Sequence, residues 1–257
     1  EMVIGNSDFL MTCACSAGPA FEGGGIEFGM RASLGAIEKV EVDRETGVAA
    51  YQTIGHVLPR GICGSGMISL LAELFMSGWI DAAGKLNRSK PSPAIRIQGR
   101  QAVYVIAAEE QSGIGQAITI SEADIDNILR AKAAIFSAIA VMLEQTGLVF
   151  SDLQQVYIAG GFGRFLDIEK AICIGLLPDL ARHKFAYIGN SSLSGAFMVL
   201  VSQEYREKQL QLAKKMTYID LSVKPGYMNQ YTGALFLPHT NRDLFPSVQR
   251  TTADRKG

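Results

Sequence analysis

Glycine-rich junctions are the segments of this sequence best suited to binding chemistry. Small residues occur at three places where a strand is expected to lead into a helix: Gly18 to Gly25, Gly160 to Gly163, and Gly189 to Ser194. Glycine lets the backbone approach a ligand closely and adopt positive φ, and the N–H groups at a helix start attract phosphate. Ligands of an open α/β sheet bind beyond the carboxyl ends of its strands. One junction alone is typical of a tight turn, whereas three in one sheet indicate a nucleotide cleft.

Two common nucleotide-binding fingerprints do not account for these junctions. The pattern G-x-x-x-x-G-K-[ST] is absent from the chain, and Gly61-Ile62-Cys63-Gly64-Ser65-Gly66 does not match G-x-G-x-x-G. The sequence therefore gives little support to a phosphate-loop NTPase or to a dinucleotide-binding fold.

The cysteines and histidines do not have the spacing of a metal site. Four cysteines and three histidines are present: Cys13, Cys15, Cys63, Cys173, His56, His183 and His239. Their spacing fits no zinc or ferredoxin pattern. We expect Cys15 to be a buried structural thiol and the chain itself to hold no metal.

Composition and charge narrow the class of protein. The 257 residues include 24 Lys and Arg against 25 Asp and Glu, and 48% are hydrophobic. A net charge of −1 gives no electrostatic reason to expect nucleic acid, and no apolar run reaches the roughly 18 residues that could span a bilayer. We expect a cytoplasmic globular protein with reduced thiols. Because the chain opens on a strand-like run, we also expect it to be a piece of a longer polypeptide.

The periodicity of apolar residues predicts strands that alternate with helices. Strands are expected at 2–5, 9–15, 37–42, 48–54, 102–108, 114–120, 156–159 and 185–188, and helices after Gly25 and at 67–76, 121–147, 167–175 and 193–215. Residues 91–93, with two prolines, are expected in a loop. An antiparallel hairpin followed by alternating elements favours a mixed sheet with helices on both faces.

Several motifs resemble those of known ATPases. Val156-Tyr157-Ile158-Ala159-Gly160-Gly161-Phe162-Gly163 resembles the adenosine motif of the acetate and sugar kinase, heat-shock chaperone and actin superfamily, in which a hydrophobic strand ends in Gly-Gly. A closer resemblance is to the reductive activators of corrinoid proteins. The segments that carry it are 15–23, 29–32, 35–37, 61–66, 158–163, Gly189-Asn190-Ser191 and 234–239. It extends over nearly the whole chain, from Glu1 to His239.

The resemblance implies a fold and a domain organisation. It implies an α/β fold of the actin-like (ribonuclease H-like) ATPase lobe type, with a mixed sheet that starts in an antiparallel hairpin. Residues 1–240 would form the C-terminal lobe, with inserted hairpins and a helix at about 37–120, and residues 241–257 a polar, mobile tail.

The resemblance also implies a function. In such activators, an upstream iron–sulfur domain supplies electrons that reduce a Co(II) corrinoid protein to Co(I), and ATP helps to drive this unfavourable step. The expected cofactors are ATP or ADP with Mg²⁺, and a 2Fe-2S cluster upstream of this chain. The expected partner is a corrinoid protein of a methyltransferase system in anaerobic metabolism, and a homodimer is one possible assembly.

The residues expected to bind the nucleotide lie at the glycine junctions. They are Gly18, Glu22, Gly160, Gly161, Phe162, Gly163, Asn190 and Ser191. Glu22 is expected at a helix start, where it could accept a hydrogen bond from ribose, order a water molecule or simply favour the helix dipole. The catalytic and Mg²⁺-binding acids are expected upstream of Glu1, so we predict little or no ATPase activity for this chain alone.

Two other functions remain open at the level of sequence. One is a small-metabolite kinase of the same superfamily, although no sugar- or acid-binding constellation is evident. The other is a non-catalytic module that senses nucleotide or docks a partner. Ferredoxin-like cysteines in the upstream sequence would favour the activator over both.

Overall fold

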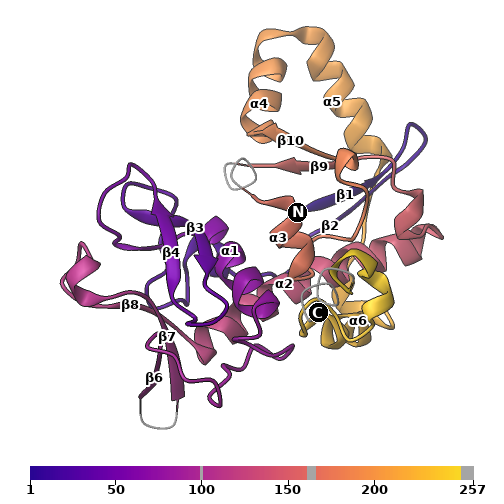
Figure 1. Cartoon of the computed structure of the whole chain (residues 1–257). Helices are drawn as coiled ribbons and strands as arrows, with labels where there is room; N and C mark the ends of the chain where they lie inside the picture. Colours follow the sequence, from indigo (N-terminus) through magenta and orange to yellow (C-terminus); the bar gives the residue numbers. More distant parts are fainter. Residues whose placement is uncertain (99–100, 161–165, 250–257) are drawn as a thin grey trace. The chain divides into compact units, whose positions relative to one another are not determined.

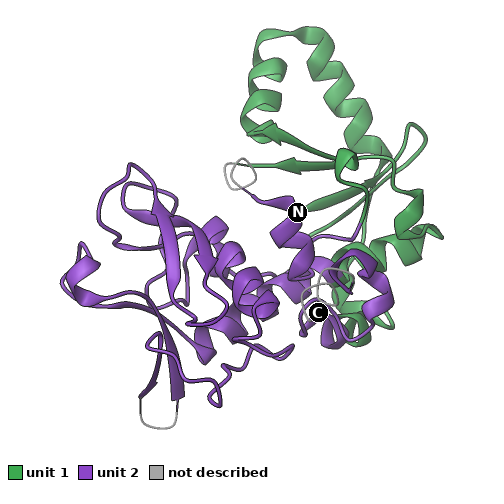
Figure 2. Ribbon diagram, in the orientation of Figure 1, with its two compact units in different colours: residues 1–15, 137–164, 180–230 green, residues 16–136, 165–179, 231–257 purple. Residues whose placement is uncertain are grey.

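The computed structural model describes residues 1–98, 101–160 and 166–249. The chain divides into two compact units, shown in Figure 2. Unit 1 contains residues 1–15, 137–164 and 180–230, and unit 2 contains residues 16–136, 165–179 and 231–257. Each unit is therefore assembled from segments that are far apart in the sequence.

Unit 1 contains two small sheets (Figure 1). Strand β1 (Met2–Gly5) pairs antiparallel with β2 (Leu10–Cys13), and β11 (Met216–Tyr218) pairs parallel with the other edge of β2. The second sheet is the parallel pair of β9 (Val156–Ala159) and β10 (Phe185–Gly189). The core of the unit is formed by Cys13, Ala138, Val141, Met142, Ile219 and Leu221.

Three helices contribute most of the remaining structure of unit 1. They are the C-terminal part of α2 (Glu122–Thr146), α4 (Ser191–Val201) and α5 (Gln203–Lys215). Helix α6 (Tyr227–Ala234) continues from this unit into unit 2. The α4–α5 pair extends from the end of β10 (Figure 1).

Unit 2 contains two three-stranded sheets and a buried helix. Strand β3 (Ala36–Val42) lies between β4 (Ala49–Thr53) and β5 (Gly61–Ile62), and β7 (Gln101–Ala107) lies between β6 (Ile95–Gln98) and β8 (Ile118–Ser121). Helix α1 (Gly64–Met76) packs on β3, and the short α3 (Ile168–Cys173) contacts α1. The largest fully buried side chains of this unit include Trp79, Tyr104, Phe136, Ile37, Ile62, Met67 and Leu71.

Helix α2 begins and ends as its sequence predicts. The Oγ of Ser121 accepts a hydrogen bond from the Asp124 amide at 3.1 Å, and an Asp124 carboxylate oxygen accepts one from the Ser121 amide at 2.9 Å. This reciprocal pair satisfies amides that the first helical turn leaves without partners. Gly147, at φ 70°, then ends the helix in the left-handed conformation that glycine adopts without strain.

Many other predicted elements are confirmed. Both antiparallel hairpins, the strands at 156–159 and 185–188, and the helix near 167–175 are present. Their signals were local: β-branched strands bounded by turn residues, and an Asp167 cap whose carboxylate accepts the Lys170 amide at 3.1 Å. The mixed parallel and antiparallel pairing was also predicted.

The predicted helix after Gly25 is wrong. No α-helix follows Gly25, and the nearest helical element is a short 3₁₀ turn before it, at Ala20–Glu22, so Glu22 does not start an α-helix. Gly23 and Gly25 lie at φ 92° and 74°, which an α-helix cannot accommodate. Gly29 instead forms a β-bridge with Ile62. The glycines of this segment shape a loop.

The single helix predicted at 193–215 is also wrong, because the chain breaks at Ser202. Ser202 is extended (φ −137°) and caps α5, with its Oγ accepting the Tyr205 amide at 3.5 Å. Strands β6 and β11 and helix α6 were missed, and β8 starts at Ile118 rather than at 114. These missed elements are short or polar, so their apolar periodicity is weak.

Three further expectations need correction. The glycine junctions do not share one sheet: the first follows β2, whereas the other two follow the β9–β10 pair. Cys15 is only half-buried. The tail predicted at 241–257 is packed at least as far as Val248, because Phe245 is fully buried and Val248 is 7% exposed; residues 250–257 lie outside the described part.

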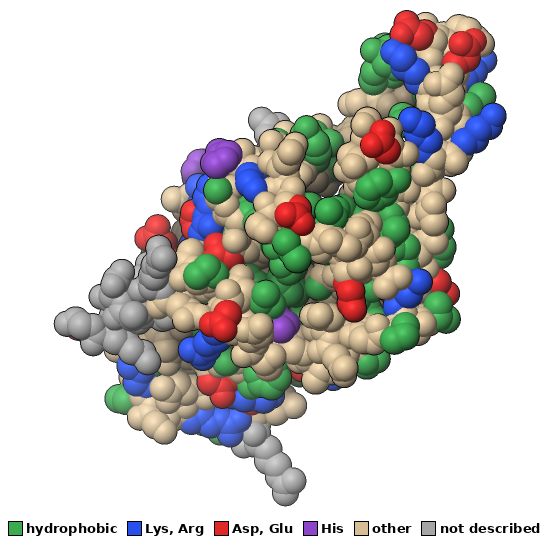
Figure 3. All heavy atoms as spheres, turned by 90° about the vertical axis from the view of Figure 1, so that its right-hand side faces the viewer, with side chains coloured by type: hydrophobic (Ala, Val, Ile, Leu, Met, Phe, Trp, Pro, Cys, Tyr) green, Lys and Arg blue, Asp and Glu red, His purple; other side chains and the backbone are tan. Residues whose placement is uncertain are grey.

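The surface is mixed in charge. On the face shown in Figure 3, acidic and basic side chains are interspersed, in keeping with the net charge of −1. Among the described residues, no helix has the length and apolar character needed to cross a membrane.

Candidate functional site

The two parallel strands of unit 1 bring two predicted glycine junctions to one edge. Because β9 and β10 run parallel, with Val156 opposite Phe185, both strands end on the same side. The Gly160 amide donates to the carbonyl of Gly189 at 2.7 Å, and the Tyr187 hydroxyl donates to the carbonyl of Gly160 at 2.8 Å. The two strand ends are therefore joined directly.

The end of this strand pair is open in the described structure. Gly160 lies at φ 98° and Gly189 at φ 71°. A methyl group at either position would meet no described atom within 4 Å. No described side chain fills the turn, so a ligand could approach the backbone there. Gly161, Phe162 and Gly163, which were also predicted to bind nucleotide, lie outside the described residues.

Asn190 and Ser191 form the start of α4 at the same edge. The Asn190 Oδ1 accepts the Leu193 amide at 3.0 Å, which fixes the first turn of the helix. Ser191 is the first helical residue. Amides at such a helix start point outwards and favour an anionic group. The structure therefore brings Gly160, Asn190 and Ser191 to one edge of unit 1.

Gly18 and Glu22 belong to unit 2, in the loop that follows β2. Both are exposed, and Gly18 lies at φ 69° with no described atom within 4 Å of a methyl group at that position. The carbonyl of Pro19 accepts the amides of Glu22 (3.0 Å) and Gly24 (2.8 Å), so the loop is closed by its own backbone. Gly18 and Glu22 thus belong to a different compact unit from the glycine junctions at Gly160 and Gly189.

The first turn of α2 holds this loop in place. Asp124, which is 6% exposed, accepts the amide of Glu27 at 3.1 Å. The side-chain amide of Asn127 donates to the carbonyl of Gly25 at 2.9 Å. These contacts order a glycine-rich segment that would otherwise have high conformational entropy.

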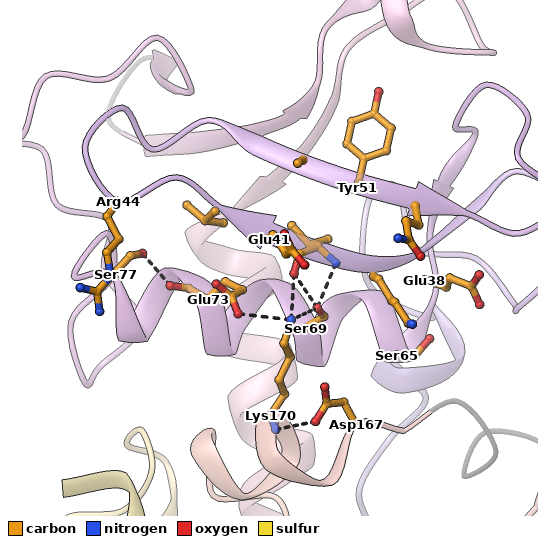
Figure 4. Close-up of a pocket in the computed structure, with 15 residues that line it drawn as sticks. Glu38, Glu41, Arg44, Tyr51, Ser65, Ser69, Glu73, Ser77, Asp167 and Lys170 are labelled. Atoms are coloured by element: carbon orange, nitrogen blue, oxygen red, sulfur yellow. Dashed lines mark hydrogen bonds and ion pairs between the residues drawn. The ribbon is translucent and has the colours of Figure 1, made fainter. Parts of the chain in front are cut away.

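Unit 2 also contains a cavity of about 810 Å³, which the sequence predictions missed (Figure 4). Strands β3 and β4, helix α1 and the start of α3 form its walls. Its polar lining residues include Glu38, Lys39, Glu41, Arg44, Tyr51, Gln52, Ser65, Ser69, Glu73, Ser77, Asp167 and Lys170. None of the predicted nucleotide-binding residues that the structure describes lines it.

A polar stripe on a buried helix was the sequence signal for this cavity. Helix α1 and its C-cap residue Ser77 place Ser65, Ser69, Glu73 and Ser77 at intervals of four, and all four line the cavity. Residues spaced by four lie on one face of a helix. Sequence reasoning recorded the apolar face of this helix and overlooked the opposite, polar one.

Lys170 fastens α3 to the wall of the cavity. Its ammonium donates to the carbonyl of Val40 at 2.9 Å and to the Oγ of Ser69 at 2.8 Å, and it lies 3.2 Å from a carboxylate oxygen of Glu73 (Figure 4). These three acceptors match the three protons of an ammonium group. Lys170 therefore acts as a structural tie, and the cavity wall combines hydroxyl, carboxylate and cationic groups.

Two of the thiols, those of Cys13 and Cys63, are buried. Burial, reinforced by the neighbouring Cys15, raises the pKa of Cys13 to about 11, so this thiol stays protonated at neutral pH. Cys63 is buried in unit 2, and its Sγ donates to the carbonyl of Ile37 at 3.3 Å. Within the described ranges, no three His, Cys, Asp or Glu side chains are grouped so that they could hold a metal ion.

Comparison with known proteins assigns the family. The model of the C-terminal domain of RACo, described as the ASKHA domain, matches residues 1–249. The chain belongs to this family. Its fold is accordingly the actin-like ASKHA fold, as the motifs at 156–163 and 189–191 had indicated.

Relatives of this RACo C-terminal domain include two curated proteins. The corrinoid activation enzyme RamQ of Eubacterium limosum is 33% identical over 238 residues, which cover 90% of this chain and 40% of RamQ. The [Co(II) methylated amine-specific corrinoid protein] reductase of Methanosarcina barkeri is 29% identical over 237 residues, covering 84% of this chain and 40% of the relative. The chain thus spans about two-fifths of the length of both.

A solved structure supports the same assignment. The reductive activator for corrinoid, iron-sulfur protein is 50% identical to this RACo C-terminal domain, with a TM-score of 0.90. The match covers 96% of this chain and 39% of that chain.

The motif at 234–239, which resembles the reductive activators, has a structural role that the sequence did not reveal. Residues 234–239 of this RACo C-terminal domain are held by Lys132 of α2, whose amine donates to the carbonyls of Phe236 (2.7 Å) and Pro238 (2.6 Å). Lys132 is fully buried, and this burial lowers its pKa well below the ordinary value.

His239, the last residue of that motif, is buried beside the same amine. Its Nδ1 accepts the amide of Asn241 at 2.9 Å, and its ring centroid lies 5.4 Å from that of Phe136. Burial lowers the pKa of His239. In the described structure its buried Nε2 has no hydrogen-bond partner. The geometry indicates a neutral imidazole in the core rather than a metal ligand.

Proposed function

We propose that this chain is the nucleotide-binding lobe of an ATP-dependent reductive activator. In the full-length protein, an iron–sulfur domain outside this chain passes one electron to a Co(II) corrinoid protein and converts it to Co(I). Membership of the RACo C-terminal family supports this proposal, as do two relatives whose names refer to corrinoid activation and corrinoid reduction.

The observation that carries the proposal is the open end of the β9–β10 pair. Gly160 and Gly189 leave backbone accessible at the carboxyl ends of two parallel strands, and α4 starts there with Asn190 and Ser191. Strand ends of this kind are where α/β folds bind nucleotides. We therefore propose ATP or ADP as the ligand, with contacts from the residues of this edge and from the neighbouring Gly161, Phe162 and Gly163.

The cavity of unit 2 is a second polar surface with the character that a nucleoside requires. The Ser65 hydroxyl and the Glu73 carboxylate can bond to amino and hydroxyl groups. Calorimetric titration of MgATP into the Ser65→Ala variant shows which of the two surfaces binds the nucleoside. Weaker binding of MgATP would assign the nucleoside to the cavity. Unchanged binding would assign the nucleotide to the glycine turn, by which we mean the turn at Gly160 and Gly189 at the end of the β9–β10 pair.

The described residues do not fit the metal groups of such an activator. They offer no cluster of acids for Mg²⁺ and no set of thiolates for an iron–sulfur cluster. We propose that Mg²⁺ is held by acids outside this chain together with the phosphates, and that the 2Fe-2S cluster resides in a separate domain. No catalytic step is assigned to residues of this chain.

The remaining aspects of the proposal concern cellular context. We propose a corrinoid protein of a methyltransferase system as the partner, a homodimer as the assembly and the cytoplasm as the location. No disulfide joins the four described cysteines, which accords with a reducing compartment.

Electron paramagnetic resonance tests the proposed activity directly. The Co(II) signal of a corrinoid protein should disappear when the full-length activator, a chemical reductant and MgATP are added together, because Co(I) has no unpaired electron. Omitting ATP is the matched control, and the signal should then persist. Loss of the signal at equal rates with and without ATP would contradict the proposal.

A further inference from the structure

The face of the β1–β2 hairpin that packs against the core of unit 1 is rich in sulfur. Met11 and Cys13 are two residues apart in β2, so they lie on the same face of the strand. Met2 stands directly opposite Cys13 in β1 and shares that face. Cys15 and Met142 of α2 belong to the same core. We call Met2, Met11, Cys13, Cys15 and Met142 the sulfur group of unit 1.

Three members of the sulfur group lie close to one another. The Cys13 thiol donates to the Sδ of Met142 at 3.2 Å, and both side chains are only 2% exposed. Cys15 packs against the core that contains this pair and interacts electrostatically with Cys13. Because Cys15 is itself only half-buried, solvent can reach its thiol. Two thiols and one thioether therefore meet, with access through Cys15.

This combination of ligands suits one class of metal ion. Thiolate and thioether sulfur are soft ligands, which favour Cu(I) over oxygen-seeking cations such as Mg²⁺ and Ca²⁺. Structural zinc sites usually take four ligands from Cys, His and carboxylate side chains rather than thioethers. We propose that Cys13, Cys15 and Met142 form a binding site for a soft monovalent cation, Cu(I) or its analogue Ag(I). The site uses none of the residues proposed for nucleotide, and it does not rest on the proposed function.

The spacing of the buried pair is compatible with a bound ion. Sulfur ligands bond to a d¹⁰ metal ion at about 2.3 Å, so two of them in a trigonal plane lie about 4 Å apart. The sulfur atoms of Cys13 and Met142 are 3.2 Å apart and would need to separate by less than about 1 Å. The unbranched methionine side chain has three rotatable bonds, which can supply a movement of this size.

The surroundings of the three sulfur atoms favour a single positive charge. The buried neighbours in this core are Ala138, Val141, Ile219 and Leu221, all of which are apolar. A charge that is left uncompensated in such surroundings is costly. One thiolate, formed when Cys15 releases its proton to solvent, neutralises a monovalent ion, and Cys13 and Met142 can add uncharged sulfur ligands. A divalent ion would leave a net charge in the core unless the buried Cys13 also lost its proton.

Competition between this chain and a Cu(I) chelator tests the site. The protein is kept reduced and free of oxygen, Cu(I) is added together with the chelator, and the copper that each chain retains is measured. Met142→Leu removes the thioether but nearly conserves the side-chain volume, an exchange that protein cores tolerate well. Cys15→Ser removes the half-buried thiol. Met67→Leu and Cys63→Ser make the same exchanges at buried positions of unit 2 and are the matched controls.

We expect the wild type to retain one Cu(I) per chain, with an affinity that falls at least tenfold in Met142→Leu and in Cys15→Ser and stays unchanged in both controls. Unchanged affinity in Met142→Leu would overturn the proposal, because the thioether would then not be a ligand. So would a wild type that retains no copper against the chelator. Equal losses in Cys15→Ser and Cys63→Ser would also overturn it, because they would show that any thiol of the chain binds the ion.

Discussion

Replacing Lys132 with methionine should change how the stability of unit 2 depends on pH. The Lys132 amine is fully buried and donates to two backbone carbonyls, those of Phe236 and Pro238, at 2.7 and 2.6 Å. Burial lowers its pKa well below the ordinary value of 10.5. A neutral amine has two N–H bonds, and these two carbonyls use both.

The direction of the pH effect follows from proton counting. Below about pH 10.5 the unfolded chain carries a proton on Lys132, whereas the folded chain does not until the pH falls to its lowered pKa. In this window the unfolded state binds more protons, so the stability of the wild type rises with pH, by about 1.4 kcal/mol per pH unit from this group. Methionine does not titrate and contributes no such slope.

The expected magnitude follows from the two carbonyl groups. In the Lys132→Met variant both lose their donor, at about 1–3 kcal/mol each. The variant should therefore be less stable than the wild type by about 2–6 kcal/mol at pH 10, and the difference should shrink as the pH is lowered towards 8.

Urea unfolding of this chain, followed by tryptophan fluorescence, measures the effect. Trp79 is the single tryptophan of the chain, and it is fully buried in the same unit as Lys132. Lys39→Met, at an exposed lysine of β3, is the control and should give a curve parallel to that of the wild type between pH 8 and 10. Parallel curves for Lys132→Met would refute the reasoning, because they would mean that the folded chain keeps Lys132 charged.

Three further outcomes are expected. Asp124→Ala should lower the free energy of unfolding by about 1–3 kcal/mol in the same assay, because the amides of Ser121 and Glu27 lose their acceptor; unchanged stability would show that water replaces the carboxylate without cost. The lowered pKa of His239 means that the unfolded state binds more protons below pH 6.5, so the wild type should lose stability as the pH falls from 6.5 to 5.5 and His239→Phe should lose less; equal losses in urea titrations at the two pH values would argue against a neutral His239. Residues 1–257 alone should release phosphate from ATP no faster than a buffer blank, and turnover near that of the full-length protein would place the catalytic acids within this chain.

The sequence predicted those parts of the fold that depend on local signals. The cap at Ser121, the glycine at 147 and the β-branched run at 156–159 each determine structure through neighbouring residues, so α2 and β9 were expected correctly. The helix expected after Gly25 does not form, because Gly23 and Gly25 adopt left-handed conformations that local composition alone does not predict. The break at Ser202 was missed because a serine can either cap a helix or continue one.

The candidate site was predictable only where it lies within one sheet. Strand ends followed by glycine indicated the junctions at Gly160 and Asn190, and parallel pairing brings them to one edge. The cavity of unit 2 depends on how α1, α3 and the β3–β4 hairpin pack together, and spacing along the chain does not encode this packing. Only the polar stripe of α1 pointed to it. The role of Lys132 could not be foreseen either, because its acceptors lie more than 100 residues away.

Calorimetric titration of MgATP into the full-length protein tests the central claim most directly. Valine at Gly160 cannot adopt φ 98° without strain, and it would place a side chain in the open turn, so Gly160→Val should bind at least tenfold more weakly than the wild type. Gly226→Val is the matched control, since Gly226 has φ 87°, equally open surroundings and a place in the same unit away from the strand ends. The account predicts one ATP per chain with weakened binding in Gly160→Val alone. Equal affinity in all three proteins, or no binding by the wild type, would contradict it.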